Sequence, residues 1–343
     1  MAMTTNQKIY IAGGALVVVL GGLWLTQRSE NKEAAQHSIN ANTTALPEIK
    51  LAAEDADKLT RIEVKNAGKS DVTLEKDGDA WKLTGPVHAA ANQNNVKLLI
   101  DNLKELKVKD VIDTGSSLYD QYELTDLKAV RVSLWKGTDK VSELVFGKSG
   151  TRGQMARIGG KDGVWVVAGY SSYQYTREVK DWRDREVLKF EDANVVSAEI
   201  ENKNGKFSFS KNGDEWSASF KGKPLPSFDP EKVKDLIRAY KSLSADDFAD
   251  DKTPADTGLD KPEGTVSFVL KDNAGTPKIA VGKISTGSSR YAQKEGLATP
   301  FILTSWNADW ATAEASKFQK ADANKDAGAA DKKDKKGEKS AKK

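Results

Sequence analysis

Carboxylates are abundant in this sequence, whereas cysteine and histidine are absent or rare. The 343 residues include no Cys, which excludes disulfides, thiolate metal sites and a cysteine nucleophile. The only histidines are His37, in the predicted spacer, and His88, in a predicted loop, which argues against a His-based triad or a multi-His metal site. Catalysis would therefore have to rest on carboxylates, hydroxyls or glycine-rich loops.

The acidic and glycine-rich stretches match no catalytic or metal-binding pattern. Asp246-Asp247 and Asp250-Asp251 suggest calcium by composition, but the stretch lacks the central Gly and final Glu of a calcium loop. Gly159-Gly160 and Gly287-Ser288-Ser289 lack the spacing of phosphate-binding loops and are typical of hairpin turns. We predict no catalytic, cofactor-binding or metal-binding residue, and a protein that is not an enzyme.

An aromatic run and a charged motif are the candidates for a partner surface. Tyr170, Tyr173, Tyr175 and Trp182 could line a groove for sugar or peptide, or pack in a core. The motif that begins at Asp181 alternates charge around a Trp and could form ion pairs between two lobes. It could also dock a partner, because Trp and Arg are favoured interface residues. The predicted partner surface consists of Tyr173, Tyr175, Trp182, Arg183, Asp184 and Arg185.

The charge distribution argues against a nucleic-acid partner. The formal net charge is +3. Residues 319–343 alone hold nine Lys against five acidic residues, so the rest of the chain is close to neutral. This low-complexity tail lacks branched apolar and aromatic residues, which predicts disorder.

The N-terminal segment predicts a membrane anchor. Residues 9–26 form an uncharged, mostly apolar run, which as a helix would span roughly 27 Å, close to the hydrocarbon thickness. The favoured interpretation is an uncleaved transmembrane helix after a short tail, residues 1–8. A cleaved signal peptide and a buried soluble helix are the alternatives. Residues 27–58 read as a flexible spacer, poor in large apolar residues.

Flanking charges barely decide the orientation of this anchor. A short tail before a first hydrophobic segment favours a signal anchor with the body outside the cytoplasm. The predicted topology is single-pass, with the body on the outer side of the membrane.

The strongest pattern is an internal repeat with a spacing of about 135 residues. Alternating residues 72–76 lead to a Gly and then Trp81, as residues 207–211 lead to a Gly and then Trp216. Apolar residues at helical spacing follow in both halves: Val96, Leu99, Ile100, Leu103 and Leu106, and Val233, Leu236, Ile237, Tyr240 and Leu243. Asn92 and Asp229 hold the N-cap positions.

The order of these elements predicts an α+β fold: two tandem copies of an antiparallel sheet with helices after the transmembrane helix. The copies span residues 59–190 and 191–318. Each closes with a helix, residues 171–183 and 306–318. They could form separate lobes or share a sheet.

These motifs resemble the bacterial DUF4340 family over roughly residues 59–318. The resemblance rests on the order of I-x-V, V-x-L-x-K-x-G-x-x-W, NNVKLLIDNLKEL, YELTDL, FGK and WRDREVLKF. The family has no established activity, so it supplies no catalytic residues. It implies a bacterial envelope protein, so the predicted location is the bacterial inner membrane, single-pass, with the body facing the periplasm. Members often occur beside components of ABC transporters of the gliding-motility type.

The expected function is that of a non-enzymatic interaction or scaffold protein, accessory to an ABC-type transport or envelope complex. The expected partners are membrane lipid, through residues 9–26, and an integral membrane protein complex. Nucleic acid and small-molecule ligands are not expected. The alternative is a module that binds cell-envelope glycan or another polymer. Exposed aromatic residues in a cleft would favour this alternative.

Overall fold

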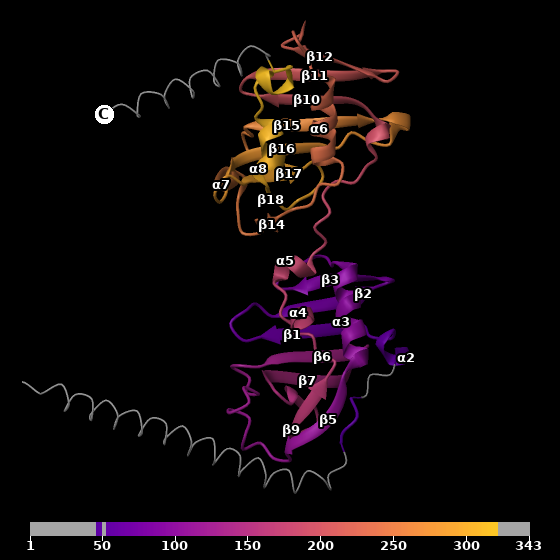
Figure 1. Ribbon diagram of the computed structural model, residues 1–343, viewed down its shortest axis with the longest axis vertical. Helices are drawn as coiled ribbons and strands as arrows, with labels where there is room; N and C mark the ends of the chain where they lie inside the picture. The colour runs from indigo at the N-terminus through magenta and orange to yellow at the C-terminus, as the bar shows by residue number, and fades with distance from the viewer. Residues whose placement is uncertain (1–45, 50–52, 322–343) are drawn as a thin grey trace, which may run out of the picture. The chain divides into compact units, whose positions relative to one another are not determined.

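The computed structural model describes residues 46–49 and 53–321 (Figure 1). The chain divides between Asp184 and Arg185 into two compact units, called unit 1 and unit 2. The predicted tail 1–8, the anchor 9–26 and residues 322–343 lie outside the described residues. Within the described part, no helix has the length and apolar character needed to cross a bilayer.

Unit 1 is built on one nine-stranded antiparallel sheet with the order β4-β3-β2-β1-β6-β7-β8-β9-β5. The strands are β1 (Arg61–Asn66), β2 (Val72–Asp77), β3 (Ala80–Gly85), β4 (Ala89–Ala90), β5 (Lys107–Asp113), β6 (Val130–Lys136), β7 (Asp139–Gly150), β8 (Gly153–Ile158) and β9 (Lys161–Ala168).

Strand β5 occupies one edge of this sheet although it precedes β6 in the chain. It pairs with β9, and its register shifts at two places. Lys107 and Lys109 on β5 are exposed. Lysines and irregular pairing protect a sheet edge from adding a further strand.

One face of the unit 1 sheet packs on the main core. Ile62 and Val64 of β1 are fully buried, whereas the residues between them point the other way. Four helices complete the unit: α2 (Ala53–Ala56), α3 (Gln93–Glu105), α4 (Ser172–Tyr175) and α5 (Val179–Trp182). Figure 1 shows α3 running across the strands. Its residues Val96, Leu99 and Leu103 are buried.

The amino end of α3 confirms the predicted cap. The Asn92 side chain accepts a hydrogen bond from the Asn95 backbone N–H at 3.0 Å. The end of the predicted spacer is part of unit 1, because Ala56 of α2 is buried in the core and Ile49 packs against it.

Unit 2 has the same strand order, β13-β12-β11-β10-β15-β16-β17-β18-β14, and every pair is antiparallel. The strands are β10 (Val195–Asn202), β11 (Gly205–Asn212), β12 (Glu215–Phe220), β13 (Lys223–Pro224), β14 (Asp247–Phe248), β15 (Gly264–Leu270), β16 (Lys278–Ile284), β17 (Arg290–Lys294) and β18 (Phe301–Leu303).

The helical segments of unit 2 are short, except for α6. They are η1 (Asp192–Asn194), α6 (Pro230–Tyr240), α7 (Pro254–Thr257), η2 (Lys271–Asn273), α8 (Ser305–Ala311) and η3 (Ala315–Phe318). The Asp229 side chain caps α6 by accepting from the Glu231 backbone N–H at 3.1 Å. The core is aromatic: the rings of Phe209 and Phe318 are 4.8 Å apart.

The predicted α+β class is wrong for the described residues. Two nine-stranded sheets dominate, and the helices are few and mostly short. The closing helix predicted over residues 171–183 consists of two four-residue turns, and the one predicted over 306–318 is α8 followed by the 3₁₀ segment η3. Apolar residues at helical spacing are also compatible with separate turns that each bury one side chain, as α4 buries Tyr175 and α5 buries Trp182.

Candidate functional site

The residues of the predicted partner surface occupy very different environments. Trp182 and Tyr175 are fully buried in the core of unit 1. The Tyr175 ring stacks on Tyr170 at 4.8 Å and lies 5.1 Å from Phe146. Their burial keeps both side chains away from any partner of the folded unit, so the prediction is wrong for these two residues.

Tyr173 is the exposed aromatic residue of the set, with 67% of its surface accessible. The Arg177 guanidinium lies 4.2 Å from the centre of its ring. The same guanidinium lies 5.7 Å from the ring centre of the buried Trp182, so Arg177 is near one exposed and one buried aromatic ring.

The charged members of the set lie on both sides of the division between the units. Arg183 is 5% exposed, and its backbone forms an isolated antiparallel β-bridge with Ala91. The Asp184 backbone N–H donates to the Ala90 carbonyl at 2.8 Å. In unit 2, Arg185 donates from Nε to the Ala245 carbonyl at 2.6 Å and pairs with Asp246 at 3.7 Å. These contacts fix each end of the motif to its own unit.

A larger polar surface lies on the sheet face of unit 1 that points away from the main core, called the outer face of unit 1. Residues alternate across a strand, so Glu63 and Lys65 on β1 and Arg131 and Ser133 on β6 share this face. A cavity of about 390 Å³ opens here. Its charged lining residues are Glu63, Lys65, Asp71, Asp126, Arg131, Lys140 and Glu143.

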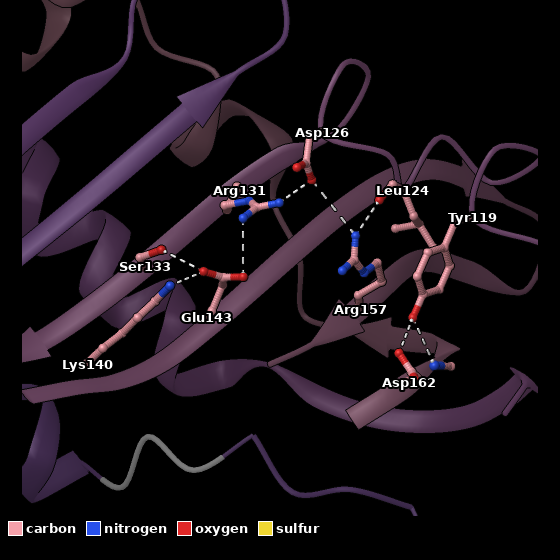
Figure 2. A network of polar contacts seen from close by, with 10 residues as sticks. Tyr119, Leu124, Asp126, Arg131, Ser133, Lys140, Glu143, Arg157 and Asp162 are labelled. Atoms are coloured by element: carbon pink, nitrogen blue, oxygen red, sulfur yellow. Dashed lines mark hydrogen bonds and ion pairs between the residues drawn. The ribbon is translucent and has the colours of Figure 1, made fainter. Parts of the chain in front are cut away.

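Glu143 of β7 is the centre of this surface (Figure 2). Its carboxylate accepts from the Ser133 hydroxyl at 3.3 Å, pairs with Arg131 at 3.5 Å and binds the Lys140 ammonium. Partial burial acts to raise the pKa of Glu143. The hydrogen bond from Lys140 and the charge of Arg131 outweigh it, and the pKa is lowered.

A second group of contacts ties the loop before β6 to the sheet. Asp126 binds Arg131 and lies 4.0 Å from Arg157 (Figure 2). The Arg157 guanidinium donates to the Leu124 carbonyl at 3.0 Å and lies 4.4 Å from the Tyr119 ring centre.

Tyr119 extends this network to the β8–β9 turn. Its hydroxyl donates to Asp162 at 3.4 Å and accepts from the Gly163 backbone N–H at 3.2 Å. A second cavity of about 210 Å³, lined by Arg157 and Asp162, shares Glu143 with the first. The outer face of unit 1 is therefore a surface of paired charges.

Such a surface suits electrostatic recognition. The lining holds four acidic and three basic side chains, so it offers both signs of charge to a partner. Among the described residues there is no group of three or more His, Asp or Glu side chains placed to hold a metal ion.

Unit 2 has hydroxyl groups at three positions where unit 1 has charges: Ser210, Ser217 and Thr265 match Glu75, Lys82 and Arg131. Other positions have hydroxyl groups in both units. The matching strands place Ser208 and Ser267 beside Glu199, as Thr73 and Ser133 lie beside Glu63. The residues called the outer face of unit 2 are Glu199, Glu201, Lys206, Ser208, Ser210, Ser217, Ser219, Thr265 and Ser267. Glu199 accepts from Ser208 at 3.4 Å and pairs with Lys206 at 3.0 Å.

Sequence reasoning missed both outer faces. Their signal is the set of polar residues that alternate with the buried ones along each strand, as Ser208 and Ser210 alternate with Phe207 and Phe209. These residues gather into a face only when the strand order is known.

Comparison with known proteins identifies the family. A family model described as a domain of unknown function (DUF4340) matches residues 81–262, which is more than half of the 343 residues. Neither a curated protein nor a solved structure matches the chain. The match begins at Trp81 and covers parts of both units, and the chain belongs to the DUF4340 family.

Proposed function

We propose that this protein is a non-enzymatic interaction or scaffold protein. In this proposal residues 9–26 anchor it in a bacterial inner membrane, the body faces the periplasm, and its partner is an integral membrane complex such as an ABC-type transporter. The observation that carries the proposal is the contrast between two outer faces on one scaffold: charged in unit 1, hydroxyl-rich in unit 2.

The charged outer face of unit 1 is suited to a protein partner. Arg131 and Glu143 are held in place by their mutual contact and by Asp126, Ser133 and Lys140, so little side-chain entropy is lost when a partner docks. Their partial exposure lets a partner add charge-assisted hydrogen bonds. A membrane tether would raise the effective concentration of even a weak site.

The hydroxyl-rich outer face of unit 2 supports the second candidate, binding of an envelope glycan. Serine hydroxyls both donate and accept hydrogen bonds, so they can match the hydroxyl groups of an uncharged polymer. Ser210 and Ser217 are directly opposite each other, as are Ser208 and Ser219, which gives paired rows across β11 and β12.

The main proposal is tested by affinity purification from crosslinked membranes, with identification of co-purifying proteins. The full-length protein is compared with a form that lacks residues 1–28 and with the charge-neutral variant R131Q/E143Q. The matched control is R238Q/D235N, which removes an exposed Arg–Asp pair of 2.6 Å on α6. We expect the same integral membrane proteins with full-length protein and control, and less of them with the other two.

Two results would contradict the proposal. Recovery of no stable protein partner would contradict the interaction or scaffold function and would favour binding of an envelope glycan. Equal recovery with R131Q/E143Q and with the control would show that the outer face of unit 1 does not hold the partner. For the glycan candidate, cosedimentation with purified cell-wall polymer should fall in S208A/S210A and persist in R131Q/E143Q.

A further inference from the structure

The long helices α3 and α6 match each other at positions outside the cores as well as at the buried positions of their own units. Val96, Leu99 and Ile100 of α3 correspond to Val233, Leu236 and Ile237 of α6, and packing against the sheets accounts for them. Two lysines outside the cores correspond as well: Lys97 with Lys234, and Lys104 with Lys241. Within each unit the two lysines are seven residues apart in the chain, so they lie on the same side of the helix.

A third lysine occupies a corresponding position on the sheet. Lys76 of β2 is directly opposite Trp81 of β3, and Lys211 of β11 is directly opposite Trp216 of β12. The two tryptophans are equally buried, each 8% exposed. Each unit thus has one Trp and one Lys at matching positions of a hairpin, and two Lys at matching positions of its long helix, where Lys241 is the C-cap of α6.

In unit 1 these residues line a single cavity of about 350 Å³. Lys76, Lys97 and Lys104 surround it, and Trp81 and Ile100 contribute apolar surface. The Gln93 side chain accepts from the Trp81 backbone N–H and donates to the Trp81 carbonyl, both at 2.9 Å, which fixes β3 against the start of α3. A cavity of this volume is within the range of small-ligand sites.

A structural role accounts for one of the three lysines. Lys104 pairs with Asp57 at 3.4 Å, and Lys241 pairs with Asp192 at 3.1 Å. Both pairs join the segment before the first strand of the unit to its long helix, and the fold explains their repetition.

The other two lysines have no repeated partner. Lys97 pairs with Asp101 one turn later at 2.5 Å, whereas Lys234 pairs with Glu231 in the preceding turn at 2.6 Å. Lys76 donates to the Asp57 carbonyl at 3.3 Å. Exposed pairs of this kind contribute little to stability. The fold therefore does not require Lys at these positions.

We infer that each unit has a binding site for a phosphate-bearing ligand between its long helix and the hairpin that carries Trp81 or Trp216. The ligand must displace or bridge the neighbouring carboxylates, each of which has one negative charge. A terminal phosphate has a charge of about −1.5 to −2 and three acceptor oxygens, so it competes better than a carboxylate for three ammonium groups. This site is separate from both outer faces and does not depend on the proposed interaction function.

The test is titration of the detergent-purified full chain with inorganic pyrophosphate in a calorimeter. We expect two sites per chain. In the variant K76Q/K97Q the affinity of the unit 1 site should fall at least tenfold, and the unit 2 site should be unchanged. In K211Q/K234Q the affinity of the unit 2 site should fall at least tenfold, and the unit 1 site should be unchanged. The control K107Q/K109Q removes two exposed lysines of β5 and should keep both sites.

The outcomes separate the sources of the phosphate. Binding of glycerol 3-phosphate, a phosphomonoester that stands for the headgroup of phosphatidic acid, at the same sites would assign a lipid headgroup, and binding of pyrophosphate alone would assign a soluble ligand. Absence of binding to both probes overturns the inference. Equal loss of binding in K76Q/K97Q and K107Q/K109Q also overturns it, because general charge would then explain the affinity. Unchanged thermal unfolding of the variants shows that they are folded.

Discussion

At the scale of single residues, Glu123 has a backbone conformation that costs free energy. Its φ is 58°, in the left-handed region, and the matching residue of unit 2 is Gly258, with φ 70°. A residue with a Cβ is strained there by about 1–2 kcal/mol, whereas Gly is not. The entropy that Gly loses on folding offsets part of the gain.

We therefore expect Glu123→Gly to raise the free energy of unfolding of unit 1 by about 0.5–1 kcal/mol. The measurement is urea unfolding followed by circular dichroism. Glu123→Ala is the matched control, because it removes the same carboxylate and keeps the Cβ. An equal gain in both variants would assign the effect to the carboxylate rather than to the backbone.

Glu143 makes the stability of unit 1 depend on pH. Its pKa in the folded protein lies below the ordinary value of 4.5, so folding favours the charged carboxylate. The stabilisation is present above pH 4.5 and is lost as the pH falls through the lower, folded pKa. The thermal midpoint of Glu143→Gln should lie below that of the unaltered protein at pH 7, and the gap should close towards pH 3. A gap that stays constant with pH would show that ionisation of Glu143 is not involved.

At the scale of elements, a glycine at a matching position of each sheet permits a close approach of two backbones. A Cβ on Gly147 of β7 would lie 2.0 Å from the Tyr122 carbonyl oxygen, and one on Gly282 of β16 would lie 2.2 Å from the Thr257 carbonyl oxygen. Backbone atoms cannot move aside as a flexible side chain can. Gly147 and Gly282 therefore mark where the segment before β6 contacts β7 and where the segment before β15 contacts β16.

Gly147→Ala should lower the free energy of unfolding of unit 1 by about 2–4 kcal/mol, and Gly282→Ala should do the same in unit 2. Chemical denaturation measures both. The control is Gly115→Ala, because a Cβ at Gly115 meets only the Asp113 carboxylate at 3.9 Å. Losses of less than about 0.5 kcal/mol, the range of ordinary surface changes, would show that the loop can shift.

Local patterns predicted the elements whose cause is local. The helices α3 and α6 and their caps at Asn92 and Asp229 follow from spacing and residue type within a dozen positions. The hairpin glycines Gly78 and Gly213 have φ of 60° and 59°, as the predicted turns require. The pairing of β5 with β9 depends on a partner about 50 residues later, and no local pattern specifies it.

The candidate site was harder to predict for the same reason. Trp182 is unusual in sequence, and its charged neighbours suggested a surface, but its indole fills the core of unit 1. Glu143 is one acid among many in the sequence. It becomes distinctive only when β6 brings Arg131 and Ser133 beside it.

At the scale of the whole molecule, each unit has its own core. The main core of unit 1 runs from Ala56 to Trp182, and that of unit 2 from Val187 to Phe318. We expect fragments 46–184 and 185–321 to fold separately, with dispersed NMR spectra and cooperative unfolding for each. A fragment that folds only when mixed with the other would show that the cores are not sufficient alone.

During synthesis, β5 leaves the ribosome before the strand with which it pairs in the unit 1 sheet. Its only partner strand in the sheet, β9, begins at Lys161, so the ribosome must add about 50 residues after β5 before the pair can form. At about 5–20 residues per second, this strand is exposed for roughly 2–10 s. Lys107, Lys109 and Asp110 give it charge through that interval, so the residues that protect the finished edge also keep the nascent chain from aggregating.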